Sequence, residues 1–250
     1  MRGILVDSCG CFPTGRHYAG IAHLLRNVAR GLAEEFAADA LWMDLPVALI
    51  DVETTGRDAS VDRVVEIGIA VGRGGQIVAR YNWLIQPSVK IPDEAKAVHG
   101  ISDEDVADSP RFETIAHEVA SALAGCIPAA YNAPFDRAFL GNEFARAGHD
   151  GAEGERPPPA LRRDVDWVDP LVWAREVQRE ERSKALGDVA ARLGVPLEKA
   201  HRASDDAEAA LRVLYALATD ARIPRVYGAF AQEQRRLGQI HADERRRWRQ

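Results

Sequence analysis

Apolar residues in the first half of the chain form three short runs that are separated by very few polar positions. These runs cover residues 47–52, 63–72 and 76–86, and Gly72–Gly75 marks a tight turn between the second and the third. Apolar runs of this length, bounded by turn residues, are typical of β-strands. Because the linkers are short, we expect the three strands to pair in an antiparallel meander.

Helical spacing of apolar residues dominates the rest of the chain. It predicts helices at 112–124, 134–147, 170–180, 184–193 and 203–218, with strands near 127–131 and 164–168 between them. Alternating strands and helices after an antiparallel start indicate an α/β protein. We therefore predict a mixed five-stranded sheet whose first three strands are antiparallel and which is flanked by helices.

The two ends of the chain differ in pattern from this middle part. Residues 1–45 are predicted to form an N-terminal helical extension, with a helix from about Tyr18 to Ala40. A central domain then covers 46–220, interrupted by a loop at 151–159 that is rich in glycine and proline. Residues 221–250 form a basic C-terminal helix or tail.

Composition and charge limit the classes of protein that need to be considered. The three cysteines, Cys9, Cys11 and Cys126, do not make an even disulfide framework, which predicts a reducing, cytoplasmic location. No apolar stretch is long enough for a membrane span, so no membrane association is expected. The net charge is −6, yet residues 221–250 hold eight arginines against three acids. This tail, with Trp248, can follow a nucleic-acid backbone, although a solvated terminal helix is the more common outcome.

Two acids stand near the end of the first predicted strand. Asp51 and Glu53 are two positions apart, so their side chains leave the strand on the same face. Adjacent carboxylates on a buried strand repel each other and lose hydration, unless a cation neutralises them. Oxygen ligands of this kind suit Mg²⁺ or Mn²⁺. Considered alone, the two acids can also be ordinary polar residues at the end of a strand, followed by a turn at Thr54–Gly56.

A third acid follows the predicted strand near 127–131. Asn132 is a candidate cap for a helix that begins near Pro134, and Asp136 then falls in the first turns of this helix. Negative charge is favoured there by the helix dipole. An ordinary acid at the start of a helix is therefore the simpler explanation of Asp136 when it is considered by itself.

The last cluster stands at the start of the predicted helix at 203–218. His201 precedes this helix and Asp206 lies in its first turns, with Asp205 beside it as a cap or bystander. Imidazole titrates near neutral pH, so a histidine at the edge of a metal site can take a proton from an attacking water. A surface histidine at a loop junction is the alternative.

Together, these motifs resemble a known family. The order Asp51-Val-Glu-Thr-Thr-Gly56, Asn132-Ala-Pro-Phe-Asp136 and His201-Arg-Ala-Ser-Asp-Asp206 is similar to the three motifs of the DEDDh 3′→5′ exonucleases. Val98-His-Gly-Ile101 resembles the substrate loop of the polymerase III type of proofreading exonuclease, and Lys184–Leu193 resembles the helix before the third motif. The resemblance covers residues 46–218 and implies a ribonuclease H-like fold for the predicted exonuclease domain.

The resemblance also implies roles for individual residues. Four acids would bind two divalent cations, Mg²⁺ or Mn²⁺: Asp51, Glu53, Asp136 and Asp206. His201 would be the general base. One cation would activate water and the other would stabilise the leaving 3′ oxygen. Contacts to the terminal nucleotide are implied for a second set: Thr54, Thr55, His99, Asn132 and Phe135.

The function that follows is hydrolysis of terminal phosphodiesters at the 3′ end of a single strand, with release of nucleoside 5′-monophosphates. DNA is the favoured substrate, and a DNA polymerase subunit is a candidate partner. Two alternatives stay open: an exonuclease for RNA or short oligonucleotides, and a catalytically silent nucleic-acid-binding module. A silent module would be expected to lack at least one ligand, whereas all five positions are filled. The oligomeric state is left open.

Overall fold

A central sheet organises the computed structural model, which describes residues 30–148, 157–197 and 201–247. Its strands are β1 (Val47–Thr54), β2 (Val64–Arg73), β3 (Gln76–Leu84) and β4 (Ile127–Ala129), in the spatial order β3-β2-β1-β4. β1 pairs antiparallel with β2, β2 pairs antiparallel with β3, and β1 pairs parallel with β4. The predicted mixed sheet with an antiparallel start is confirmed.

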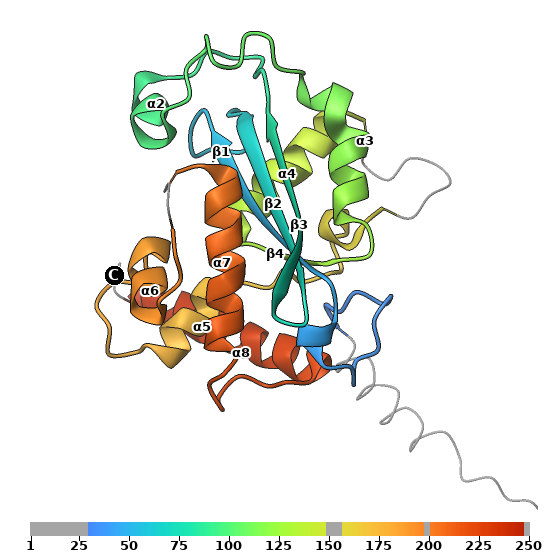
Figure 1. Ribbon diagram of the computed structural model, residues 1–250, viewed down its shortest axis with the longest axis vertical. Helices are drawn as coiled ribbons and strands as arrows, with labels where there is room; N and C mark the ends of the chain where they lie inside the picture. The colour runs from blue at the N-terminus through green and yellow to red at the C-terminus, as the bar shows by residue number, and fades with distance from the viewer. Residues whose placement is uncertain (1–29, 149–156, 198–200, 248–250) are drawn as a thin grey trace, which may run out of the picture.

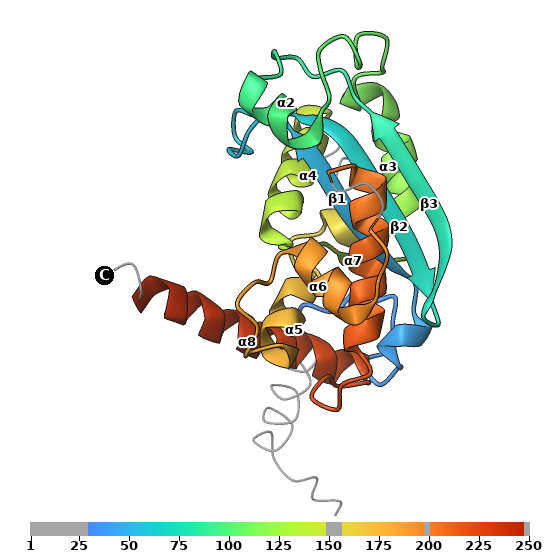
Figure 2. The ribbon, with the colours of Figure 1, turned by 60° about the vertical axis from the view of Figure 1, so that its left-hand side comes forward.

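Helices cover both faces of this sheet (Figures 1 and 2). On one face lie α3 (Phe112–Leu123) and α4 (Pro134–Arg146). On the other lie α5 (Pro170–Val177), α6 (Leu186–Leu193), α7 (Ala203–Leu217) and α8 (Tyr227–Arg247). A short helix, α2 (Asp93–His99), stands beyond the end of β1, and two 3-10 turns complete the described elements: η1 (Trp42–Asp44) and η2 (Pro159–Leu161).

Side chains of β1 alternate between the two hydrophobic layers, as a strand requires. Val47 and Leu49 belong to the cluster under α7, whereas Ala48 and Ile50 belong to the cluster under α3 and α4. The odd-numbered positions of β1 therefore face α7. This alternation decides the side of the sheet on which the next odd-numbered residues, which are acids, come to lie.

Two expectations about secondary structure are wrong. The sheet has four strands and not five, because residues 164–168 form only isolated bridges, Ala129 with Val168 and Gly31 with Val165. Of the helix expected from Tyr18 to Ala40, the part at 30–40 consists of turns and a bridge, and the remainder lies outside the described residues. Conversely, α2 was not expected, since seven residues are too few for a clear helical repeat.

The segment before β1 packs against the last helix. Leu41 forms an antiparallel bridge with Val226, and the Ala33 N–H donates to the hydroxyl of Tyr227 (3.1 Å). Trp42 stacks on Phe230 of α8, with ring centroids 4.6 Å apart. The division into an extension, a central domain and a tail stays a prediction, but parts of all three share one hydrophobic cluster. Within the described ranges, no helix has the length and apolar character that crossing a membrane requires.

Candidate active site

The first two acids lie on the side of β1 that faces α7. Asp51 and Glu53 are both half-buried, at the end of the strand where α2 and the start of α7 lie (Figure 1). α7 approaches the sheet closely because its start rests on Gly68 of β2. A Cβ at Gly68 would lie 2.1 Å from the carbonyl carbon of Ala203. A glycine is therefore required for this contact between helix and strand.

Asp136 reaches β1 from the other side of the sheet, from the first turn of α4. β4 pairs only with Val47, Ala48 and Leu49, so the second half of β1 has no neighbouring strand on this edge. The vacant edge is used by the buried Asp136 carboxylate, which accepts a hydrogen bond from the Val52 N–H (3.2 Å). The shortness of β4 thus gives the third acid access to the strand that carries the first two.

The start of α4 is fixed by a buried acid that the sequence analysis missed. The Asp169 carboxylate caps α5 by accepting from the Leu171 N–H (2.9 Å). It also accepts from the backbone N–H groups of Asn132 (3.0 Å) and Ala133 (3.3 Å). In turn, the Asp169 N–H donates to Oε1 of Gln234 in α8 (2.8 Å). The C-terminal helix is therefore connected to the turn that presents Asp136.

His201 and Asp206 occupy the turn that leads into α7. The His201 N–H donates to Oδ2 of Asp206 (2.8 Å), and His201 has a left-handed backbone with φ of 67°. Each of Glu53, His201 and Asp206 offers one ligand atom, and these three atoms all lie within 4.8 Å of one another. A carboxylate, a second carboxylate and an imidazole at this spacing form a group that can hold a metal ion.

The acids raise one another's pKa values. Burial is the main cause of the raised pKa of Asp51, and the charges of Asp136, Asp206 and Glu53 raise it further. Burial and the charge of Asp206 raise the pKa of Glu53 from 4.5 to about 7, although Arg202 opposes this shift. The pKa values of Asp136 and Asp206 are also raised, in both cases mainly by burial. These shifts show that the charges of the four acids interact. They indicate an excess of negative charge in the site that the protein does not neutralise by itself.

A fifth acid lies beside this group, and the sequence analysis did not identify it either. Glu66 of β2 is fully buried and is the register partner of Glu53. Its carboxylate forms an ion pair with Arg202 (2.8 Å). The sequence signal was weak, since an acid inside an apolar strand is a notable position but does not reveal a partner far along the chain.

The residues expected to contact substrate line one cavity of about 710 Å³ next to the acids. They are joined there by Glu53 of β1, by Gly56 and Arg57 of the segment after β1, and by Val98 of α2. His99 is buried, and burial lowers its pKa, although an interaction with the Thr54 backbone opposes this. The Nδ1 atom of His99 accepts from the Ile101 N–H (3.1 Å), which fixes the ring.

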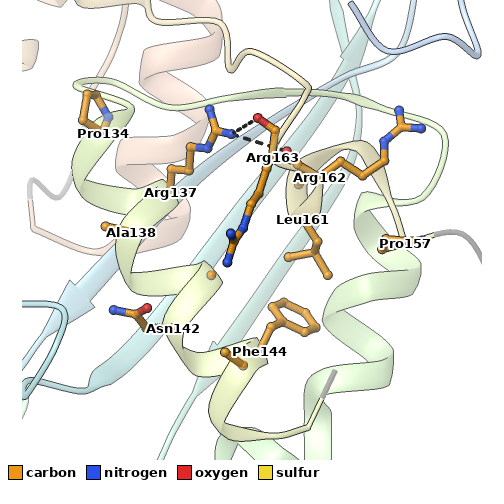
Figure 3. Close-up of a pocket in the computed structure, with 12 residues that line it drawn as sticks. Pro134, Arg137, Ala138, Asn142, Phe144, Pro157, Leu161, Arg162 and Arg163 are labelled. Carbon is orange, nitrogen blue, oxygen red and sulfur yellow. Dashed lines mark hydrogen bonds between the residues drawn. The ribbon is translucent and has the colours of Figure 1, made fainter. Parts of the chain in front are cut away.

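A second cavity, of about 530 Å³, lies between α4 and residues 157–163 (Figure 3). Arg137 donates from one nitrogen to the carbonyl oxygens of Arg162 (3.3 Å) and Arg163 (3.1 Å) at its edge. None of the ten residues predicted for the active site lines it. The cavity that matches the motifs is therefore the one beside Glu53.

Comparison with known proteins identifies the class to which this fold and site belong. The model of an exonuclease family, RNase T, matches residues 48–214. The chain belongs to this exonuclease family. The matched range contains the residues of all three predicted motifs.

Curated relatives carry a similar segment inside much longer proteins. The DNA polymerase III PolC-type of Thermotoga maritima is 31% identical over 194 residues, which is 78% of this chain and 13% of that protein. The 3′-5′ exonuclease DinG of Staphylococcus saprophyticus is 29% identical over 160 residues, which is 64% of this chain and 17% of that protein. The chain thus spans less than a fifth of the length of either relative.

Among solved structures, a zinc-bound E. coli exonuclease I in complex with single-stranded DNA is similar to this chain. The TM-score is 0.61 and the identity is 20%, over 74% of this chain and 42% of that chain. At this identity the likeness concerns the fold. Together with the family match, it confirms the α/β, ribonuclease H-like class.

Proposed function

We propose that this protein is a divalent-metal-dependent 3′→5′ exonuclease that removes nucleoside 5′-monophosphates from the end of a single strand. The observation that carries the proposal is the convergence of Asp51, Glu53, Asp136 and Asp206 beside His201, from three separate parts of the chain: β1, the start of α4 and the turn into α7. Membership of the exonuclease family supports the same reaction.

The donor set fits hard divalent cations. Carboxylate oxygens are the ligands that Mg²⁺ and Mn²⁺ prefer, and a few of them leave positions for water and phosphate. Raised pKa values at Asp51, Glu53 and Asp136 support the need for positive charge in the site. We propose two cations, held by the four acids. When bound, such cations supply Lewis acidity toward the phosphate and lower the pKa of water.

The chain's own residues would contribute orientation and proton transfer. His201 is exposed at the turn before α7, so its ring can take a proton from a water that attacks the terminal phosphate. The buried Thr54 and Thr55 line the adjacent cavity with Phe135, which offers a ring face to a base. His99 and Asn132 line the same cavity and are proposed to contact the terminal nucleotide.

The favoured substrate is DNA, and the relatives support this choice. They are a DNA polymerase III and a 3′-5′ exonuclease, so a DNA polymerase is also the candidate partner. Rates on single-stranded DNA, on RNA of the same sequence and on a dinucleotide would test the choice. Faster cleavage of RNA or of the dinucleotide would assign the enzyme to the alternative substrate class.

The direct test uses a 5′-labelled single strand with Mg²⁺ or Mn²⁺. We expect a ladder that shortens from the 3′ end and the release of mononucleotides, both abolished by a chelator. Asp51→Asn should remove activity, and His201→Ala should lower kcat by roughly 10²–10⁴-fold, as the loss of a general base does.

Two variants serve as matched controls. Asp205→Asn removes the acid next to Asp206, and His117→Ala removes an exposed histidine of α3. Both should retain the wild-type rate. Wild-type rates in Asp51→Asn and His201→Ala would overturn the proposed mechanism.

A further inference from the structure

Glu66 is a charged group in a position that normally excludes charge. It lies within β2, has no exposed surface, and is opposite Glu53 in the antiparallel register. A buried carboxylate is costly unless hydrogen bonds and an opposite charge compensate it. A second negative charge beside Glu53 also disfavours ionisation of Glu53, and Glu66 contributes to its raised pKa. A hydrophobic residue would avoid both costs.

The hydrogen bonds of Glu66 show how its carboxylate holds the start of α7. Its Oε1 accepts from Nη2 of Arg202 (2.8 Å) and from Nδ2 of Asn82 (3.0 Å). Its Oε2 accepts from the backbone N–H of Ala203 (3.2 Å), the first residue of α7. One carboxylate therefore holds both the side chain before the helix and the first free N–H of the helix.

These contacts lie between the two motif residues of the α7 turn, His201 and Asp206. Arg202 directly follows His201, and its carbonyl oxygen accepts from the N–H of Asp206 (3.0 Å). With the left-handed backbone of His201 on one side and the helix on the other, the turn is fixed to the sheet at Arg202 and Ala203. The ligand atoms of His201 and Asp206 are thereby held near Glu53, which belongs to the neighbouring strand.

We propose that Glu66 is a positioning residue of the active site. Through Arg202 and the Ala203 N–H it holds Asp206, a proposed cation ligand, and His201, the proposed general base, close to Glu53. The inference rests on the proposed metal-dependent function and adds a residue that supports the ligands without being one. Partners of this kind, which orient ligands from behind, commonly change metal affinity when they are altered.

A merely structural role would give a different pattern, and the chain contains a matched residue for the comparison. Glu143 of α4 is also a buried carboxylate paired with an arginine, since it binds Arg63 at 2.6 Å and 2.7 Å. It also accepts from the Val64 N–H in β2 (3.2 Å). Its hydrogen bonds to the described residues come from Arg63, Val64 and Arg146, and none of these partners is one of the four acids or His201. Loss of Glu143 should therefore affect folding stability alone.

The experiment measures Mn²⁺ binding by isothermal titration calorimetry for the wild type, Glu66→Gln and Glu143→Gln, with melting temperatures recorded for each. We expect Glu66→Gln to bind Mn²⁺ about 10- to 100-fold more weakly and to lose kcat with little change in KM for single-stranded DNA. Glu143→Gln should lower the melting temperature and bind Mn²⁺ with the affinity of the wild type.

A double-mutant cycle connects the effect to Arg202. If Glu66 acts through Arg202, the variant Glu66→Gln/Arg202→Gln should bind Mn²⁺ no more weakly than the worse single variant. Wild-type affinity in Glu66→Gln, or an equal loss in Glu143→Gln, would overturn this inference. A wild type that binds no Mn²⁺ would instead refute the proposed function, so the two failures are distinguishable.

Discussion

Asp51 of β1 and Gly68 of β2 are direct partners in the antiparallel pair of strands. The backbone of Ala203 and Ser204 occupies the space above Gly68 that a side chain would fill. The first predicted motif and the turn of the third are thus brought together at a position where one strand has no side chain. The distance between the two motifs depends on this glycine.

Gly68→Ala should consequently damage the site. The added Cβ would meet backbone atoms of α7 at 2.1–2.3 Å, and backbone cannot rotate away as a side chain can. We expect a loss of stability of about 1–3 kcal/mol from overpacking. A shift of the turn by about 1 Å would lower kcat by roughly 100-fold. Chemical denaturation and single-strand hydrolysis measure the two effects.

Gly141→Ala is the control for this prediction. Gly141 lies within α4, and a Cβ there has no neighbour within 4 Å. Alanine is favoured over glycine in a helix by roughly 1 kcal/mol, so this variant should be slightly stabilised and fully active. Full activity in Gly68→Ala would show that the contact is not needed.

The raised pKa of Glu53 predicts how stability depends on pH in the metal-free protein. The usual value is 4.5 and the folded value is about 7, so the folded state holds a proton that the unfolded state releases between these two pH values. The free energy of unfolding should therefore fall as pH rises from 4.5 to 7. Each pKa unit corresponds to about 1.4 kcal/mol, which partial exposure of Glu53 reduces, so we expect a contribution of roughly 1–3 kcal/mol.

Glu53→Gln tests the origin of this pH dependence. At pH 8, without metal, the variant should be more stable than the wild type, because it removes a charge that burial and neighbouring acids disfavour. Thermal melts with and without Mn²⁺ should show stabilisation by Mn²⁺ in the wild type and much less in the variant. If the melting temperatures of metal-free wild type and Glu53→Gln were equal at pH 8, the electrostatic explanation would be wrong.

Gln234 should matter more than its place in the terminal helix suggests. Its amide joins two backbone groups, accepting from the Asp169 N–H and donating to the Trp167 carbonyl (2.9 Å). Gln234→Leu leaves both groups unpaired in a buried place, which costs about 1–3 kcal/mol for each. We expect a lower melting temperature and a reduced kcat, because Asp169 holds the turn before Asp136.

Gln239 of the same helix is exposed and provides the comparison for Gln234. Gln239→Leu should leave both the melting temperature and kcat unchanged. If both glutamine variants melted at the wild-type temperature, the connection between α8 and α4 would have no energetic role.

The arginines at the end of α8 should contribute little to substrate binding. This part of the helix projects from the end of the molecule opposite α2 and the start of α7 (Figure 2). Replacing Arg245, Arg246 and Arg247 with glutamine should therefore leave KM for single-stranded DNA, and its dependence on salt, nearly unchanged. Each lost phosphate contact would lower the slope of log affinity against log salt by about 0.7. A decrease of about 2 would show that the tail follows the nucleic-acid backbone.

The strands and helices that the sequence predicted share one property, which is that their signal is local. The apolar runs at β1, β2 and β3 contain their own boundaries and turns. Residues 164–168 have the apolar content of a strand and form hydrogen bonds through Asp166 and Val168, but these go to different segments. A continuous ladder depends on the length of the neighbour, and β4 is only three residues long. Apolar content cannot reveal that length.

The same distinction applies to the site. The five motif residues could be predicted because each motif is short and its order along the chain is specific. Glu66 and Arg202 are 136 residues apart, and Gln234 is 65 residues from Asp169. Supporting contacts of this range arise only from packing. The sequence therefore predicted the groups proposed to react, but not the groups that hold them in place.

The bridge between Leu41 and Val226 brings the segment before β1 and the start of α8 together. Both lie at the end of the sheet remote from the acids, where β1 begins (Figure 1). The segment before β1 and the last helix therefore close the fold against each other at the end of the sheet opposite to the acids.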